Sequence, residues 1–295
     1  MARKNIFQLV EENYNIQDEI KKINRLFTTY GYFKIGFSEH TFKKILENYL
    51  FEDWKYNDTC ITIEEYLERV NAKLPANSRA NDDRIINFLE VMENFIKLYF
   101  DNANSLYSEY QIQPFMSFSS TFYKLINTLE KRMGLTTREY KDKIIIYPKN
   151  APLEKVIELT DDEDVQWELI RYVREDLSLS EKRKSLAYLA TNLYIEEDSD
   201  EKDPRIKELI NKAGNILNNL HIRHNNKTGK WENKILDGIS EEEAITLCDM
   251  AYNEMLTIEL LRDHKKYEQT YYEFNKKQRE ASKKKKAEGK SNGQA

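Results

Sequence analysis

The stretch "TDDEDVQWELIRYVREDLSLSEKRKSLAYLATNLYI" (160–195) contains two closely spaced signals for the start of a helix. Thr160 is followed three residues later by Glu163, and Ser178 by Glu181. This spacing is typical of a capping box, in which the hydroxyl and the carboxylate each accept a hydrogen bond from a backbone amide of the first turn. The stretch therefore predicts two consecutive helices, and the short connection between them favours antiparallel neighbours in a bundle.

Two further helices are predicted downstream of this stretch. Asp203 followed by Pro204 matches an N-cap with proline at the first helical position, and this helix is expected to run through Leu220. Ser240 and Glu243 form a third capping box, which opens the last helix. Their apolar stripes contain Ile206, Leu209, Ile210, Ala213, Ile216 and Leu217 in the first helix and Ile245, Cys248, Tyr252, Met255 and Leu256 in the second. The second half of the chain is therefore expected to form a four-helix bundle.

The first half of the chain also shows mainly helical periodicity. Helices are predicted from the apolar spacing between Ile6 and Phe27, after Ser38, from Thr62 with Glu65 to Val70, from Asp82 or Asp83 onward, and over about 119–133 before Gly134. The stretch "YGYFKIGF" (30–37) is aromatic and bounded by glycine, so it could form a strand or a buried loop.

One segment interrupts the helical pattern. Ile144 to Tyr147 are four bulky residues that precede Pro148, which favours a short strand that ends at the proline. We expect a domain boundary here. The predicted fold is mainly α, with at most one or two short strands, and it comprises a helical N-terminal domain (1–142) that senses or regulates and a four-helix domain (143–275).

The composition excludes several classes of protein. The chain has 295 residues, a mean hydropathy of -0.77 and 33% charged residues, with no apolar run that could span a bilayer. Its first residues, "MARKNIFQLVEENYN", lack the long apolar stretch that is expected of a signal peptide. The two cysteines, Cys60 and Cys248, allow one disulfide at most, so a reducing cytoplasm is the simpler expectation. The sequence has no phosphate-binding GxxxxGK motif and no serine-hydrolase elbow.

The charge is distributed unevenly along the chain. From Arg262 to the end there are eleven basic and five acidic residues, whereas the whole chain carries a net charge of -5. Residues 276–295 contain almost no apolar side chains and are predicted to be disordered. Such a basic tail could solubilise the chain, or it could bind nucleic acid through its lysines, because clustered lysines attract phosphate.

The stretch "NNLHIRHNN" (218–226) contains two of the four histidines and lies between the last two predicted helices. A fixed arginine binds phosphate, and a histidine can move a proton near neutral pH. One histidine and one arginine beside a phosphodiester are sufficient for RNA cleavage without a metal ion. The candidate catalytic residues are His221, Arg223 and His224, and the candidate RNA-binding residues are Asn225, Asn226, Lys227 and Lys230.

A purely structural interpretation of the same stretch stays open, because basic residues at a helix C-terminus bond the last carbonyls and asparagine is common in turns. A metal site is not expected. His221 and His224 supply only two zinc ligands, and the acidic stretch 161–163 is better explained by the first turn of a helix, where carboxylates are favourable. No cofactor is predicted.

The stretch "IIIYPKNAPLEKV" (144–156), the four-helix segment and "NNLHIRHNN" together resemble the higher-eukaryote-and-prokaryote nucleotide-binding (HEPN) superfamily, and most of all its bacterial abortive-infection and toxin-like members. The resemblance covers roughly 143–275. It implies an all-helical, often dimeric domain that in active members is a metal-independent endoribonuclease. The family signature is an arginine, a polar residue and a histidine a few positions later. Arg223 and His224 match its first half, whereas the next histidine is His264.

Three functional hypotheses follow. The first is a cytoplasmic anti-phage ribonuclease of the abortive-infection type, working as a homodimer on host or phage RNA, with a phage-derived or antitoxin protein as a further partner. The second is a non-catalytic helical interaction or RNA-binding module of a phage or mobile-element system. The third is a nucleic-acid-binding protein that works through its lysine tail.

Overall fold

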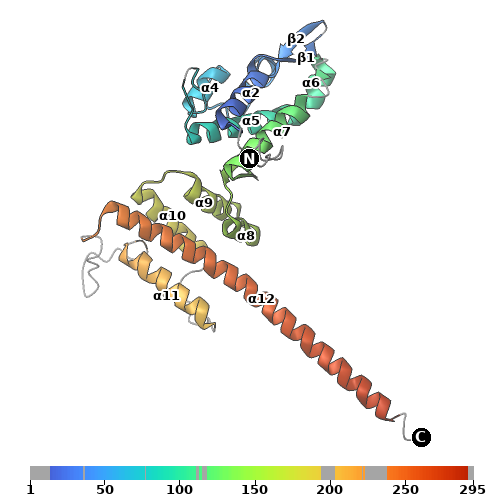
Figure 1. The fold of residues 1–295 in the computed structure, drawn as a ribbon, viewed down its shortest axis with the longest axis vertical. Helices are drawn as coiled ribbons and strands as arrows, with labels where there is room; N and C mark the ends of the chain where they lie inside the picture. Colours follow the sequence, from blue (N-terminus) through green and yellow to red (C-terminus); the bar gives the residue numbers. More distant parts are fainter. Residues whose placement is uncertain are drawn as a thin grey trace, which may run out of the picture. The chain divides into compact units, whose positions relative to one another are not determined.

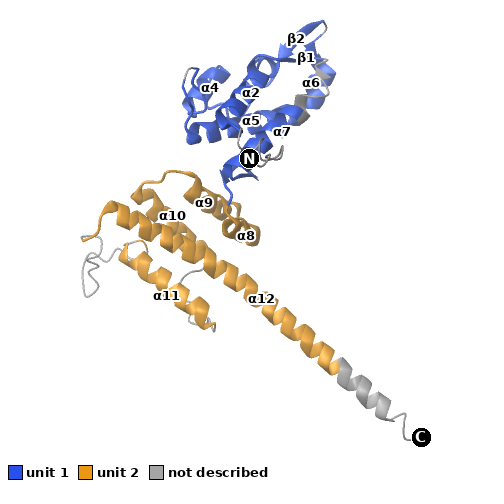
Figure 2. Cartoon of the chain, viewed as in Figure 1, with its two compact units in different colours: residues 1–149 blue, residues 150–295 orange. Residues whose placement is uncertain are grey.

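The structure is a computed structural model that describes residues 14–35, 37–76, 78–110, 113–114, 118–193, 203–220, 222 and 238–291. These residues form two compact units, 1–149 and 150–295 (Figure 2). The division falls after Lys149, seven residues later than the predicted boundary after residue 142. The reason is that the strand expected at the boundary pairs within the first unit.

The first unit combines six helices with five short strands among its described residues (Figure 1). In chain order they are α2 (Ile16–Thr28), β1 (Gly31–Ile35), β2 (Ser38–Thr41), α3 (Phe42–Tyr49), α4 (Ile63–Arg69), α5 (Asp82–Asp101), α6 (Ala103–Tyr110), β3 (Gln113–Pro114), α7 (Phe118–Met133), β4 (Leu135–Tyr140) and β5 (Lys143–Pro148). The mainly helical prediction is confirmed, although five strands exceed the one or two expected.

Local capping chemistry sets several of these boundaries. α3 begins after Thr41, whose hydroxyl accepts a hydrogen bond from the Lys44 amide, so the predicted cap at Ser38 was wrong: Ser38 lies in β2. The Thr62 hydroxyl accepts from the Glu65 amide as expected, but the Glu65 carboxylate accepts from the amide of Ile61. Each arrangement still satisfies amides that the first helical turn leaves unpaired.

The strands form two antiparallel sheets. One has the order β2-β1-β3, and β1 is the stretch that could have been a strand or a buried loop. The other is a hairpin of β4 and β5, with Thr137 opposite Ile146. Its connection consists of Lys141 and Asp142, both in the left-handed region with φ of 46° and 64°. Two left-handed residues are typical of the turn that suits the twist of a hairpin.

Aromatic side chains fill the core of the first unit. Phe27 lies 5.8 Å from the ring of Phe42 and 5.8 Å from that of Phe95, so α2, α3 and α5 meet at one cluster. The Phe33 ring extends the cluster to β1, at 5.8 Å from Phe42. Rings at such separations contribute interaction energy beyond the burial of their area.

Two carboxyl groups are buried in this unit. Glu93 of α5 is 4% exposed and Glu130 of α7 is 5% exposed. Burial raises the pKa of Glu93 to about 8, with a further increase from Glu130, and burial raises the pKa of Glu130 to about 7. An apolar environment disfavours the charged form of a carboxyl, so both groups hold protons at pH values where exposed glutamates are ionised.

The second unit comprises five helices among its described residues (Figure 1): α8 (Ala151–Leu159), α9 (Glu163–Arg174), α10 (Leu179–Asn192), α11 (Pro204–Asn219) and α12 (Glu241–Ser291). The four predicted helices are α9 to α12, and α8 precedes them. Asn150 caps α8, with Pro152 in its first turn. The predicted cap at Thr160 was wrong. Its hydroxyl bonds the Val156 carbonyl at the end of α8, and Asp162 caps α9.

The remaining predicted caps of this unit are confirmed. Ser178 and Glu181 form a reciprocal capping box at α10, and Asp203 caps α11 with Pro204 at its first position. The side chain of Arg205 lowers the pKa of Asp203 to about 2. The structure describes helix α12 as far as Ser291, within the stretch 276–295 for which the sequence predicts disorder. Lysine, alanine, glutamate and glutamine all favour helix, and no proline interrupts this stretch.

The structure also bears on membrane-spanning helices and on the two cysteines. Within the part of the chain that the structure describes, none of the helices combines the length and the apolar character needed to cross a bilayer. Cys60 and Cys248 are both buried free thiols, so they do not form the disulfide that the sequence allowed.

Candidate functional site

All seven predicted site residues lie outside the described residues. They are His221, Arg223, His224, Asn225, Asn226, Lys227 and Lys230. The structure does define both ends of the segment that contains them. Leu220, at the end of α11, is fully buried, and the Ile222 amide donates to the Leu217 carbonyl at 2.8 Å. Such a bond from beyond the helix end closes the last turn and fixes where the helix stops.

The other end of the segment is fixed by the start of α12. The Ser240 amide donates to the Glu243 carboxylate at 2.7 Å, and the Glu243 amide donates to the Ser240 hydroxyl at 3.2 Å. This is the predicted capping box. The hydrogen bond from the Ser240 amide lowers the pKa of Glu243 below its ordinary value, so the carboxylate stays charged beside the positive end of the helix.

α11 and α12 are antiparallel neighbours (Figure 1). Lys212 forms an ion pair with Glu254, and Arg205 lies 3.8 Å from Glu268, so lower numbers in α11 face higher numbers in α12. The end of α11 and the start of α12 therefore lie at the same end of this helical hairpin. The segment 221–239 connects these two helix ends along the chain.

The same contacts place His264 away from that end. His264 lies on α12, is exposed, and its Nε2 is 3.3 Å from the Glu268 carboxylate. Glu268 in turn faces Arg205, at the beginning of α11. His264 therefore belongs to the opposite end of the α11–α12 hairpin, and it does not supply the later histidine of the signature.

α9 and α10 also reach the end that carries the segment. Lys182, near the start of α10, donates to Asp249 of α12 at 2.7 Å, and Tyr172, near the end of α9, donates to the same oxygen at 2.9 Å. Basic residues cluster in these parts of the two helices: Arg171, Arg174, Lys182, Arg183 and Lys184. Arg171 is bonded to Glu168 and Glu175, and acidic residues at the start of α12 lie at this end as well.

Tyr172, Lys182 and Asp249 form the polar centre of this region. The Tyr172 ring stacks on Tyr252 with 4.3 Å between centroids, and the Lys182 ammonium lies 4.4 Å from the Tyr172 centroid. The Tyr252 hydroxyl donates to the Leu169 carbonyl at 2.8 Å. Burial raises the pKa of both tyrosines far above their ordinary value, with Asp249 adding to the rise at Tyr172. These hydroxyls therefore remain protonated and are hydrogen-bond donors that join the helices.

Cys248 is next to this centre but has no properties of a nucleophile. It is fully buried, and burial raises the pKa of its thiol to about 11, with a further rise from Asp249. A cysteine reacts as its thiolate, which is scarce near neutral pH when the pKa is raised this far. The buried thiol fills the core of the bundle.

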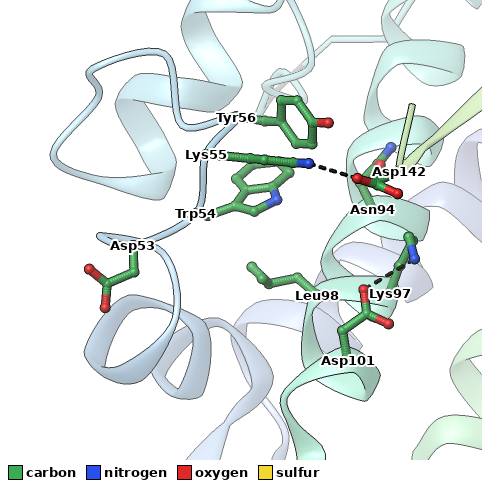
Figure 3. A pocket seen from close by; sticks show the side chains of 9 residues that line it. All are labelled: Asp53, Trp54, Lys55, Tyr56, Asn94, Lys97, Leu98, Asp101 and Asp142. Atoms are coloured by element: carbon green, nitrogen blue, oxygen red, sulfur yellow. Dashed lines mark hydrogen bonds and ion pairs between the residues drawn. The ribbon is translucent and has the colours of Figure 1, made fainter. Parts of the chain in front are cut away.

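A pocket of about 310 Å³ lies in the first unit, between α5, the loop after α3 and the β4–β5 turn (Figure 3). Trp54, Tyr56 and Leu98 supply its apolar surface, and Asp53, Lys55, Asn94, Lys97, Asp101 and Asp142 its polar surface. Its cations are bonded within the unit. Lys55 is 2.8 Å from Asp142, and Lys97 is 3.1 Å from both Asp101 and Glu139.

Tyr56 of this pocket also makes contacts within the first unit. The Tyr56 hydroxyl donates to the Lys141 carbonyl at 2.5 Å, and Lys143 lies 4.0 Å from the ring centroid. The side chain of Lys55 lowers the pKa of Asp142 below its ordinary value. The loop therefore binds the hairpin turn, and the polar groups of the two segments pair with one another. The pocket is best explained as the boundary between the loop and the turn.

Among the described residues, no group of three or more histidine, cysteine, aspartate or glutamate side chains could hold a metal ion. The acidic residues near position 162 lie at the start of α9. There the Asp162 carboxylate accepts hydrogen bonds from the Asp164 and Val165 amides. Sequence reasoning did not find the Tyr172–Lys182–Asp249 cluster or the pocket, because each depends on how separate elements pack.

Comparisons with protein-family models, with curated proteins and with solved structures find no match to this chain. The functional assignment therefore depends on the chemistry of the residues and on where the helices place them.

Proposed function

We propose that the second unit acts on RNA as a metal-independent endoribonuclease of the abortive-infection, anti-phage type. The observation that carries this proposal is that the end of α11 and the start of α12 lie at the same end of their antiparallel hairpin, the end shared with α9 and α10. The sequence between these two helix ends contains two histidines and an arginine, and binding and catalytic residues are often found in segments that a rigid scaffold positions.

The proposed chemistry uses two kinds of group. His221 or His224 acts as general base and takes the proton of a ribose 2′-hydroxyl, whose oxygen then attacks the adjacent phosphorus. Arg223 binds the phosphate oxygens and stabilises the charge that develops on them. The 5′ oxygen leaves and takes up a proton. The products are a 2′,3′-cyclic phosphate and a 5′-hydroxyl, and no metal ion takes part.

The binding residues of the proposal are Asn225, Asn226, Lys227 and Lys230. Basic side chains in α9 and α10 at the same end of the bundle support it, because RNA binding depends largely on cations beside phosphates. We also propose that the chain works in the cytoplasm as a homodimer, and that an antitoxin or a phage-derived protein controls it through the first unit.

The position of His264 favours a second candidate function, a non-catalytic helical interaction or RNA-binding module. The signature that the chain resembles requires a histidine a few positions after the arginine. His264 lies at the opposite end of the α11–α12 hairpin, so catalysis must depend on His221 or His224. A chain that binds RNA or a protein without cutting would carry the same segment and the same bundle.

An expression experiment separates the two candidates. The wild type and the Arg223→Ala, His221→Ala and His224→Ala variants are induced in a bacterial host, and growth and RNA integrity are followed. The Tyr272→Ala variant is the control, because this exposed side chain of α12 lies away from the segment. The ribonuclease proposal expects growth arrest with RNA fragmentation for the wild type and the control, and loss of both for Arg223→Ala and one histidine variant. A wild type that leaves growth and RNA unchanged supports the interaction module.

A further inference from the structure

α12 continues beyond Glu268, and its described side chains there are largely exposed. Arg262 donates to the Leu193 carbonyl at 2.8 Å, and Glu268 faces Arg205 at 3.8 Å. Beyond Glu268, large aromatic side chains of α12 are exposed: Tyr271 by 68%, Tyr272 by 71% and Phe274 by 56%, with Tyr267 at 63% just before it. A stretch of helix without tertiary contacts is only marginally stable in water, and clustered exposed aromatic residues mark interaction surfaces.

Most of these side chains share one face of the helix. Leu260, His264, Tyr267, Tyr271, Phe274 and Gln278 follow one another at alternating intervals of four and three residues. This is the spacing of the two core positions in a coiled coil, and we name these six residues the aromatic seam. Tyr272 lies outside the seam although it is the neighbour of Tyr271. The surrounding residues are mostly charged or amide side chains, as expected for a helix that pairs along one face.

We propose that the aromatic seam binds the aromatic seam of a second copy of this chain in antiparallel orientation. The charged residues beside the seam are complementary to a second copy of the chain, and they favour one orientation of that copy. In a parallel pair, Asp263 of one copy would face Glu268 of the other, and like charges repel. An antiparallel pair with Tyr267 opposite Tyr271 places Asp263 opposite Lys277 of the second copy, and symmetry forms this pair twice.

Antiparallel pairing also suits the seam residues themselves. It places His264 opposite Phe274, so aromatic rings meet along the central layers of the pair. The two Glu268 side chains meet beside the two-fold axis, and their repulsion is offset by Arg205, which lies 3.8 Å from Glu268 in each chain. The surface is separate from the proposed RNA site, because it begins at the opposite end of the α11–α12 hairpin. The inference does not depend on the chain having ribonuclease activity.

The first test disrupts the seam in the full-length chain. Tyr271→Glu introduces a charge at its centre, and Tyr272→Glu makes the same change one residue away, outside the seam. Sedimentation velocity and light scattering measure the mass as a function of concentration, and circular dichroism checks the fold. We expect the wild type and Tyr272→Glu to form a dimer. For Tyr271→Glu we expect the dissociation constant of the dimer to rise about tenfold or more, because a buried unpaired charge costs more free energy than an exposed one.

The second test exchanges charges. Asp263→Lys and Lys277→Asp should each weaken association, by about tenfold if both symmetric pairs are lost. The double variant should restore it. Tighter association of Asp263→Lys alone would overturn the antiparallel orientation, because that change favours a parallel pair. A wild type that stays monomeric at high concentration, or a dimer that Tyr271→Glu leaves intact, would overturn the proposal and indicate that another segment or another protein covers the seam.

Discussion

The side-chain amide of Asn94 exchanges two hydrogen bonds with the backbone of Ile144: its Nδ2 donates to the Ile144 carbonyl at 2.8 Å, and its Oδ1 accepts from the Ile144 amide at 2.9 Å. Two residues along β5, the Ile146 amide donates to the Glu90 carboxylate at 2.8 Å. One edge of β5 pairs with β4, so α5 satisfies its other edge with side chains. An unpaired strand edge would otherwise be open to aggregation.

We expect Asn94→Leu to destabilise the first unit by about 2 kcal/mol, because it leaves the partly buried amide and carbonyl of Ile144 without these partners. Urea unfolding followed by circular dichroism measures the loss. Asn253→Leu is the matched control. That exposed asparagine bonds only the Asp249 carbonyl of its own helix, and its loss should cost under about 0.5 kcal/mol. Equal effects of the two changes would contradict the structural role of Asn94.

The buried pair of Glu93 and Glu130 makes the stability of the first unit depend on pH. The pKa of each carboxyl is raised in the folded chain, to about 8 and about 7 against the ordinary 4.5. The folded chain therefore holds protons that the unfolded chain has released, and this stabilisation is lost as the pH rises through these values.

Glu93→Gln should remove most of this dependence, since an amide of similar shape cannot ionise. We expect the melting temperature of the wild type to fall between about pH 5 and pH 8, and that of Glu93→Gln to change less and to exceed the wild type at the higher pH. Calorimetry measures both, with the exposed Glu52→Gln as the control. A wild-type profile as flat as that of Glu93→Gln would show that the two carboxyls are not buried together.

Asp249 should couple α9 to α10. It accepts hydrogen bonds from Tyr172 and Lys182, and the Lys182 side chain is only 13% exposed, whereas Asp249 is about half exposed. Asp249→Ala and Tyr172→Phe should show a coupling energy of about 1 kcal/mol in a double-mutant cycle, because the hydrogen bond is shared but partly screened by solvent. Strictly additive effects of the two changes would rule out this coupling.

Removal of residues 276–295 should leave the midpoint of unfolding unchanged, because the described side chains from Lys276 to Glu280 are exposed. It should reduce the helical circular dichroism signal, since α12 extends to Ser291. The same deletion tests the tail as an RNA-binding element: if the tail binds RNA, its loss lowers the slope of affinity against salt. A large loss of thermal stability would contradict this account.

The helices could be predicted from the sequence because local chemistry determines where they begin. Ser178 with Glu181, Ser240 with Glu243, and Asp203 with Pro204 each act within one turn, so the pattern and the structure agree. The predicted cap at Thr160 was wrong because its hydroxyl bonds a carbonyl of the preceding helix, α8. The sequence pattern did not reveal this helix. The predicted cap at Ser38 was wrong because Ser38 lies in a strand that pairs with β1.

The hairpin and the polar clusters depend on contacts that a linear pattern does not contain. The β4–β5 turn uses Lys141 and Asp142 in left-handed conformations, instead of the glycine or asparagine that usually marks such a turn. The Asn94–Ile144 bonds join residues fifty positions apart. For the candidate site, the sequence predicts the residues, and the structure defines the helix ends that hold them.

The most direct test of the central claim is RNA cleavage by the purified chain in the presence of a chelator. A labelled RNA is incubated with the wild type, Arg223→Ala, His221→Ala, His224→Ala and the Tyr272→Ala control, and a DNA of the same sequence lacks the attacking 2′-hydroxyl. The account predicts cleavage of RNA alone by the wild type and Tyr272→Ala, and losses of about 10²–10⁴-fold for Arg223→Ala and for one of the two loop histidines. Equal rates for all variants, or no cleavage by a folded wild type, would contradict it.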